Sequence, residues 1–306
     1  MYTHTIGIIR GGETHERERS LALGSALLHI LEDTDYGTAD IFVDEHGTWW
    51  KNGMRIDPSQ ALHTLACIIP AFSAVSPIAS RAVRLSEQHG VPYIGATPAI
   101  KSIAHHPEER AHSLFKIGIT TPRVVSLRTY DAPSAEEVAW KIVRAHSLPL
   151  RTISIPMQEH AHTAPALTSI QEIRDALVSM QSGMRDIFVE EEVVGTHVTV
   201  YLIDGFREEE RYVFPPVSTL TNTPCTWSKE EGKNIERIAK ETADALSLEG
   251  FVRVDMTLTQ KNAVVRDVRT VPDFTTSSPL HRALESVGAT KKEVIEHIVR
   301  TVVGDM

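Results

Sequence analysis

Short apolar runs alternate with helical stripes over the first 95 residues. Thr5–Arg10 is an apolar run that ends at Gly11-Gly12, and leucine, isoleucine and alanine then recur every three or four positions from Leu21 to Leu31. The run is typical of a buried strand, and the spacing is the apolar stripe of a helix. The alternation predicts an α/β domain with a mostly parallel sheet. Its further predicted elements are strands at Ala39–Val43, Ala66–Pro70 and Val91–Gly95 and a helix at Ile78–Gly90.

Helical stripes and strands also alternate beyond residue 97, with a predicted hairpin close to the C-terminus. The hairpin pairs Phe251–Leu258 with Ala263–Val268. We expect three domains, at residues 1–97, 98–186 and 187–306. The other predicted helices are Pro98–Lys116, Ser134–His146, Ile170–Met180, Glu230–Leu246 and Lys291–Val303, and the other predicted strands are Val124–Leu127, Leu148–Pro156, Ile187–Glu191 and Thr196–Ile203.

Charge and composition exclude several classes of protein. The 306 residues carry a formal net charge of −9. Nucleic acids and anionic membrane surfaces attract proteins with a surplus of lysine and arginine, so neither is an expected partner. No apolar run approaches the ~20 residues of a membrane span, and the N-terminus lacks a signal-peptide pattern. Two cysteines, far apart, suit a reducing compartment, so a cytoplasmic location is expected.

Six stretches, in this order along the chain, resemble the D-alanine–D-alanine ligase family. They are GGETHERERS (11–20), GVPYIGATPAIKSIA (90–104), IGITTP (117–122), FVEEEVVG (188–195), VRVDM (252–256) and DVRTVPDFTTSSPL (267–280). The resemblance implies an ATP-grasp fold, in which a Rossmann-like N-terminal domain with a parallel sheet (a pre-ATP-grasp domain) precedes two α+β lobes. It also implies a cytoplasmic, homodimeric enzyme of peptidoglycan synthesis that uses ATP and Mg²⁺ to ligate D-alanine.

The resemblance assigns substrate roles to three residues. Glu16 matches a glutamate that orients the ammonium of the first amino acid, and Arg253 matches an arginine that faces the acyl phosphate. Ser278 falls near a serine that receives the carboxylate of the second amino acid, although Pro279 shifts the local alignment. The structural alternatives are a helix cap for Glu16 and a surface ion pair for Arg253.

The magnesium site of the family is only half present. Asp255 and Asp267 match the two family carboxylates that hold Mg²⁺, but the family asparagine two places further on is Arg269. A guanidinium cannot ligate a metal and carries a positive charge of its own. We therefore weigh a magnesium site against a salt-bridge cluster of Arg269 with the two aspartates, and favour the cluster.

Most of the nucleotide-binding residues are replaced. Glu190, Glu191 and Val193 match the hinge strand that contacts adenine. The two family lysines, however, correspond to Pro107 and Ile155, and the loop MQEHAHTAPA lacks the glycines that let backbone amides approach phosphate. His197 takes the place of the acid that holds the ribose, and Asp273 takes the place of a glycine.

Two functions remain open at this point. The sequence favours a ligase-like protein that has lost ATP binding and ligation, or keeps them only weakly, and acts as a binding or structural protein. Its candidate ligands are D-alanine, another small amino acid or a dipeptide, and no cofactor is expected. The alternative is an active ATP- and Mg²⁺-dependent carboxylate–amine ligase with relocated phosphate ligands. The candidates for such ligands are Lys101, Lys116, Lys141 and Arg151.

Overall fold

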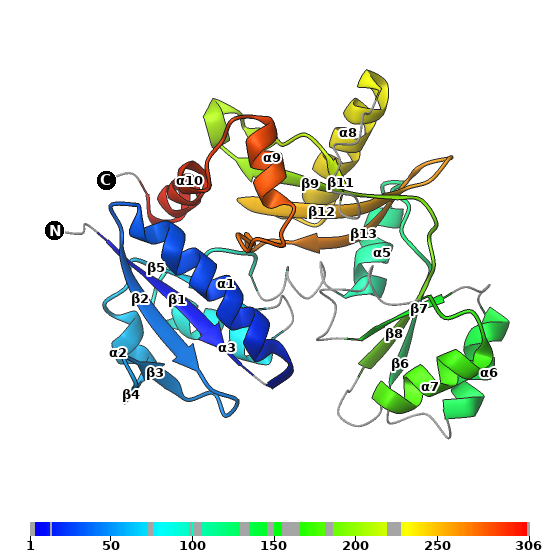
Figure 1. The fold of residues 1–306 in the computed structure, drawn as a ribbon, viewed down its shortest axis with the longest axis horizontal. Helices are drawn as coiled ribbons and strands as arrows, with labels where there is room; N and C mark the ends of the chain where they lie inside the picture. The colour runs from blue at the N-terminus through cyan, green and yellow to red at the C-terminus, as the bar shows by residue number, and fades with distance from the viewer. Residues whose placement is uncertain are drawn as a thin grey trace.

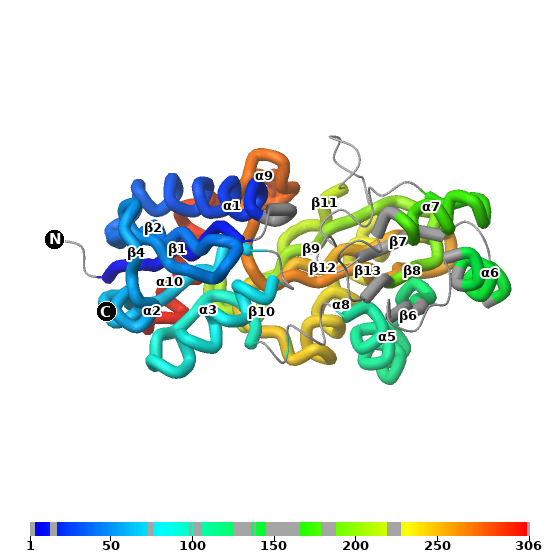
Figure 2. The backbone as a smooth tube through the Cα atoms, turned by 90° about the horizontal axis from the view of Figure 1, so that it is seen from below, coloured from blue at the N-terminus to red at the C-terminus, as the bar shows by residue number. Residues whose placement is uncertain are grey.

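The described part of the computed structural model contains three separate β-sheets with helices packed around them (Figure 1). The structure describes residues 4–12, 14–72, 76–97, 100, 106–128, 135–145, 150–154, 166–180, 186–218 and 228–304. The N-terminal sheet and the small central sheet lie at opposite ends of the molecule in Figures 1 and 2. Within the described residues, no helix is long and apolar enough to span a bilayer.

The N-terminal sheet has the order β4-β3-β2-β1-β5. Its centre is parallel, as predicted: β1 (Thr5–Gly11) pairs with β2 (Gly37–Val43) and with β5 (Cys67–Pro70). The hairpin of β3 (Trp49–Lys51) and β4 (Met54–Ile56) adds two antiparallel strands. The helices of this domain are α1 (Thr14–Glu32), α2 (Pro58–Leu62) and α3 (Pro77–Gln88).

Two local features of this domain follow from backbone chemistry. Gly11 has φ of +120°, and a Cβ there would lie 2.2 Å from the carbonyl oxygen of Val43, so the turn from β1 into α1 requires glycine. The prediction of an edge strand at Val91–Gly95 is wrong, because this segment forms only an isolated parallel bridge between Tyr93 and Ile68. Pro92 has no N–H to donate to a ladder, and Gly95 turns the chain with φ of +119°.

The C-terminal sheet has the order β10-β9-β12-β13, with β11 paired to β9. It consists of β9 (Thr196–Asp204), β10 (Arg211–Val213), β11 (Val217–Ser218), β12 (Phe251–Leu258) and β13 (Ala263–Arg269). The predicted hairpin of β12 and β13 is confirmed. A short 3₁₀ turn, Phe206–Glu208, joins β9 to β10. The helices are α8 (Lys229–Ala245), α9 (Leu280–Ser286) and α10 (Lys291–Val303); capping boxes begin α8 and α10.

The central sheet has the order β6-β8-β7 and is antiparallel. Its strands are β6 (Val124–Arg128), β7 (Leu150–Ser154) and β8 (Asp186–Glu191), and the helices α6 (Ala135–Ala145) and α7 (Ile170–Met180) pack on each other beside it. Helix α5 (Pro107–Phe115) lies between this sheet and the C-terminal one (Figure 1). The domain boundaries remain a prediction, and the pairing of β8 favours a central lobe that extends to Glu191.

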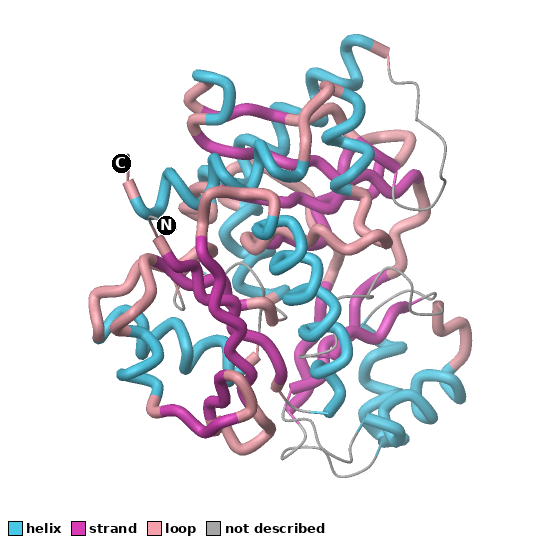
Figure 3. Tube along the Cα trace, turned by 60° about the vertical axis from the view of Figure 1, so that its left-hand side comes forward, coloured by secondary structure: helices cyan, strands magenta, loops and turns pink. Residues whose placement is uncertain are grey.

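One apolar core joins the two ends of the chain. Leu27 and Leu31 of α1 and Ile69 of β5 belong to the same buried cluster as Ile295 and Ile298 of α10. Helices α10 and α1 are in contact, so the last helix packs on the N-terminal domain (Figure 3). This return packs α10 against α1, which contains most of the GGETHERERS stretch.

Candidate functional site

The candidate site lies on one face of the C-terminal sheet. The strand register places Arg253 opposite Arg269, Asp255 opposite Asp267, and Thr199 of β9 beside Asp255. Side chains alternate between faces along a strand, so these five groups share a face, while Val254 and Val268 point to the other. The β12–β13 hairpin and the strand β9, which is distant from it in sequence, thus assemble one charged face.

Arg253 and Asp255 form a buried ion pair on β12. The guanidinium Nε of Arg253 donates to Oδ1 of Asp255 at 3.0 Å, and the Thr199 hydroxyl donates to the same oxygen at 2.5 Å. Burial acts to lower the pKa of Arg253, but the negative charge of Asp255 and, less strongly, Tyr201 and Asp267 raise it above its ordinary value. Arg253 therefore stays protonated at any physiological pH.

Asp267 lies between two guanidinium groups. Nε of Arg269 donates to Oδ2 of Asp267 at 3.0 Å, and Nη1 of Arg110, from α5, lies 3.6 Å from Oδ1. A divalent cation does not fit this arrangement, because the arginines already supply the positive charge and would repel the ion. Within the described residues, no group of three or more His, Cys, Asp or Glu side chains is arranged to hold a metal.

A β-bulge at Arg266 directs the side chain of this residue toward the central lobe. Asp255 pairs with Asp267 but Met256 pairs with Val265, so Arg266 is the extra residue of the bulge. Its Nε and Nη2 donate to Oε1 of Glu190 on β8 at 3.1 and 2.9 Å. The two side chains are 4% and 2% exposed, and burial raises the pKa of Glu190 despite the attraction of Arg266.

Arg110 connects this buried pair to the charged face. Its Nη2 donates to the backbone carbonyl of Arg266, while Nη1 faces Asp267. Beside it the His106 ring packs edge-on against Phe188 of β8 at 4.8 Å. Helix α5 thus places a cation where β8 and β13 meet, and ties the central lobe to the C-terminal sheet.

Helix α1 and the loop after β13 complete the site. Nη2 of Arg19 lies 3.5 Å from Oδ2 of Asp273. Burial and the repulsion of Arg269 and Arg253 lower the pKa of Arg19 to about 10. The Ser20 hydroxyl accepts from the Gly11 amide at 2.9 Å and donates to the Ala71 carbonyl, so it holds the start of α1 on the sheet.

Several residues predicted from the sequence lie in or beside the charged face. Arg253, Asp255 and Asp267 come together there, and Ser278 is buried near Tyr201, the neighbour of Arg253 on β9. Glu190 is buried against Arg266 instead of facing an open hinge. The catalytic and metal-binding roles of these residues remain predictions.

Some of the other predicted residues have side chains outside the part of the chain that the structure describes, and the remainder have surroundings of their own. Glu16 lies in α1, but its side chain is outside the described residues, as are Lys101, Ile155, most of the loop MQEHAHTAPA and the Arg151 side chain.

Glu191 and Val193 are half-buried; the Glu191 amide donates to the Arg123 carbonyl at 2.9 Å, and both adenine roles remain predictions. His197 is buried, with Nδ1 3.2 Å from the Thr257 hydroxyl. Lys116 and Lys141 are exposed.

Three arginines of the site were missed by the sequence analysis: Arg19, Arg110 and Arg266. For two of them a signal exists. Arg110 shares the buried stripe of α5 with Pro107 and Leu114, and an arginine on an apolar stripe requires a buried partner. Arg266 follows the apolar run Ala263–Val265 in an otherwise buried strand. We find no comparable sequence signal for Arg19, whose neighbours in the site lie on other elements.

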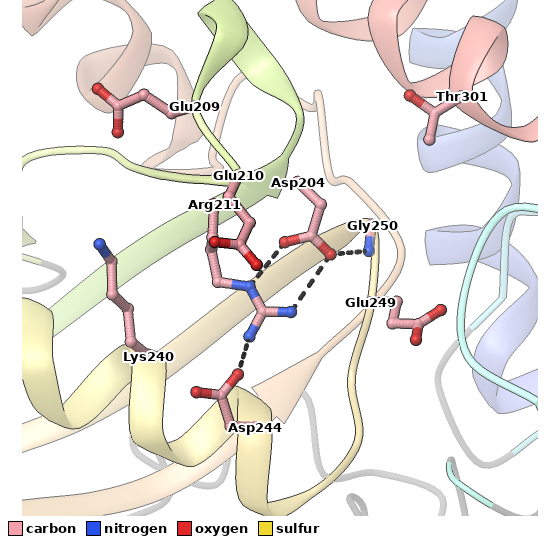
Figure 4. A pocket seen from close by; sticks show the side chains of 9 residues that line it. All are labelled: Asp204, Glu209, Glu210, Arg211, Lys240, Asp244, Glu249, Gly250 and Thr301. Carbon is pink, nitrogen blue, oxygen red and sulfur yellow. Dashed lines mark hydrogen bonds and ion pairs between the residues drawn. The ribbon is translucent and has the colours of Figure 1, made fainter.

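A cavity of about 740 Å³ lies elsewhere on the C-terminal lobe (Figure 4). Arg211 lies in its middle and donates to Asp204 at 2.6 Å and to Asp244 at 2.5 Å, so it ties the start of β10 to α8. None of the residues predicted from the sequence to form the site lines it. The lining residues are Asp204, Glu209, Glu210, Arg211, Lys240, Asp244, Glu249, Gly250 and Thr301.

Comparison with known proteins agrees with the fold and with the motifs. The family model for the D-ala D-ala ligase C-terminus matches residues 206–300. A D-alanine–D-alanine ligase of Carboxydothermus hydrogenoformans is 26% identical over 313 residues, covering 96% of each chain. The structure of a D-alanine-D-alanine ligase from Coxiella burnetii superposes with a TM-score of 0.80 at 17% identity, covering 99% of this chain and 94% of that one.

A second solved structure is that of a D-alanine–D-alanine ligase from Bacillus anthracis complexed with ATP. It superposes with a TM-score of 0.76 at 17% identity, covering 98% of this chain and 97% of that one. The structural likeness establishes the ATP-grasp fold. Together with the family model, which matches residues 206–300, and the full-length relatives, it shows that this chain is similar to D-alanine–D-alanine ligases at low sequence identity.

Proposed function

We propose that this protein is a ligase-fold binding protein in which ATP-dependent ligation is lost or strongly reduced. Its ligand would be D-alanine, another small amino acid or a dipeptide, bound beside Arg253 and Ser278 in the cytoplasm. One observation carries the proposal: Asp267, a proposed magnesium ligand, lies between the guanidinium groups of Arg269 and Arg110.

The physical argument concerns the charge that a nucleotide requires. Phosphoryl transfer relies on positioning and on cations that neutralise the phosphate oxygens, and Mg²⁺ needs oxygen ligands to stay in place. Each charge-assisted hydrogen bond to phosphate contributes about 1.5–3 kcal/mol, so the loss of several such contacts weakens nucleotide binding by orders of magnitude. Pro107 and Ile155 supply no such contacts.

The hinge strand supports the same proposal. Glu190 matches the strand that contacts adenine in the family, and here its carboxylate is buried in an ion pair with Arg266. To free this position, the chain would have to separate a desolvated ion pair, and leaving either charge buried without its partner is strongly unfavourable.

Calorimetry with Mg²⁺-ATP tests the proposal directly. We expect no heat of binding at micromolar nucleotide concentrations, and no release of ADP in a coupled assay with D-alanine. Micromolar affinity, or turnover that Arg253→Ala abolishes, would instead establish the alternative, an active carboxylate–amine ligase with relocated phosphate ligands. That alternative has its own support in the names of the full-length relatives.

The oligomeric state is a separate part of the proposal. The family resemblance suggests a homodimer, and sedimentation equilibrium of the full chain measures it. A mass of about twice the 33.9 kDa of one chain is expected. A single species with the mass of one chain would contradict the dimer without affecting the proposal on ligation.

A further inference from the structure

Like charges face each other across β12 and β13. Arg253 lies directly opposite Arg269, and Asp255 lies directly opposite Asp267. Directly opposite side chains on antiparallel strands have Cβ atoms roughly 4.5–5.5 Å apart, and like charges in such positions destabilise the sheet. In each strand the arginine is bonded to the aspartate two residues away, at 3.0 Å in both cases.

Arg110 offsets the repulsion between the two aspartates, whereas Arg19 adds positive charge beside the two arginines. Arg110 from α5 approaches Asp267, which adds to the positive charge beside the opposed carboxylates. At the other end Nη2 of Arg19, from α1, lies 3.5 Å from Oδ2 of Asp273 in the loop that follows Arg269, and repulsion by Arg269 and Arg253 contributes to the lowered pKa of Arg19. Three guanidinium groups from three elements therefore gather at one end of the charged face.

This end is both partly dry and accessible. The side chains of Arg253 and Arg269 are 9% and 11% exposed, whereas that of Arg19 is 32% exposed. A guanidinium presents several N–H donors in a planar fork that matches the oxygens of a carboxylate or phosphate. Partial burial strengthens such a contact because the local dielectric is lower than in water.

We propose that Arg253 and Arg269, with Arg19 beside them, bind the oxyanion of a small acid directly and without a divalent metal. In this arrangement the guanidinium of Arg269 lies between Asp267 and the bound anion, and its positive charge takes the place of a metal ion. The ligand class is a carboxylate or a phosphate monoester. The inference rests on the proposed function, because it describes how the same site holds a ligand without Mg²⁺-ATP.

Titration calorimetry of the full chain in EDTA, with inorganic phosphate and separately with D-alanine as probes, tests the inference. The wild type should bind at least one probe, and the stronger of the two identifies a phosphate or a carboxylate as the preferred group. Added Mn²⁺, in a parallel titration without chelator, should leave the affinity unchanged. Absence of binding by both probes, or binding strengthened more than roughly tenfold by Mn²⁺, would overturn the inference.

Arg269→Asn is the decisive variant and Arg55→Asn its matched control. Both remove one positive charge, but Arg55 is an exposed residue of β4, far from this face in the sequence and in the fold. Arg269→Asn should weaken probe binding roughly tenfold or more, and Arg55→Asn should leave it unchanged. Equal losses in the two variants would show a general effect of net charge and would contradict the site.

A third variant separates binding from folding. Arg269→Lys keeps the charge but replaces the fork with a single ammonium, so its affinity should lie between those of the wild type and Arg269→Asn. Thermal unfolding of each variant confirms that the chain is folded at the temperature of the titration. Failure of phosphate and D-alanine to bind would remove this inference, whereas the proposed loss of ligation is decided separately by ADP release.

Discussion

The two faces of the C-terminal sheet are built from alternate residues of the same strands, yet they are stabilised differently. On β12, Val252, Val254 and Met256 enter an apolar core with α8, whereas Arg253 and Asp255 lie on the charged face. Apolar burial is non-directional and nearly proportional to area, so its contributions are largely independent. Buried charges depend on their partners, and removal of one leaves another uncompensated. The apolar face should therefore tolerate substitution better than the charged face.

The largest effect is expected where the charged network passes between lobes. Arg266→Ala leaves Glu190 buried without its arginine, and should lower the free energy of unfolding by about 3–5 kcal/mol. Urea unfolding followed by circular dichroism measures this change. The double variant Glu190→Gln/Arg266→Met removes both charges and should recover most of the loss.

A matched surface pair shows whether burial is the cause. Arg237 and Glu241 form an exposed ion pair at 2.6 Å on α8. Arg237→Ala should change the free energy of unfolding by less than about 1 kcal/mol, since exposed pairs are screened by solvent. If Arg266→Ala cost no more than Arg237→Ala, the distinction between the two faces would lose its basis.

The apolar face should respond with an intermediate loss. Val254→Ala removes two methyl groups from a fully buried position and should destabilise the protein by about 2 kcal/mol. This loss should not depend on salt concentration, because no charge is involved. Unfolding in 0.05 M and 0.5 M NaCl measures both properties, and a strong dependence on salt would contradict the assignment of Val254 to the apolar face.

The smallest effect is expected at the edge of the charged face. Thr199→Val keeps the shape of the side chain but removes the hydroxyl that donates to Asp255. A hydrogen bond to a charged group contributes about 1.5 kcal/mol at the lower end of its range, and a loss of this size is expected in urea unfolding. Thr257→Val serves as the control, because the Thr257 hydroxyl bonds to a histidine nitrogen and not to a carboxylate. Its free energy of unfolding should fall by about 1 kcal/mol or less.

Most of the secondary structure could be predicted because it depends on local pattern. The last helix was predicted at its observed bounds, Lys291–Val303, and the strands β12 and β13 lie within one residue of their predicted ends. One wrong prediction, Val91–Gly95, concerns a short apolar run whose pairing is limited by Pro92. Short runs contain too little periodicity to show whether a partner strand continues alongside them.

The candidate site was predictable only in part. Asp255, Asp267 and Arg269 were singled out, with a salt-bridge cluster of Arg269 and both aspartates as the favoured interpretation. The ion pair of Arg269 with Asp267 agrees with it, whereas Asp255 is paired with Arg253. Arg110 and Arg266 were not singled out, because their partners lie on other elements: Arg266 reaches Glu190, which is 76 residues away. Contacts over such distances in sequence leave no periodic signal.

The sequence by itself determined the family resemblance, the order of strands and helices, and the absence of lysines at the two matched positions. Each of these is a property of local residue types and their spacing. Only the tertiary structure decided which arginine meets which carboxylate. A one-residue bulge in β13 redirects Arg266, and the packing of α1 and α5 brings Arg19 and Arg110 to the same face. Which charges form pairs depends on their distances in space, and these distances are set only when the chain folds.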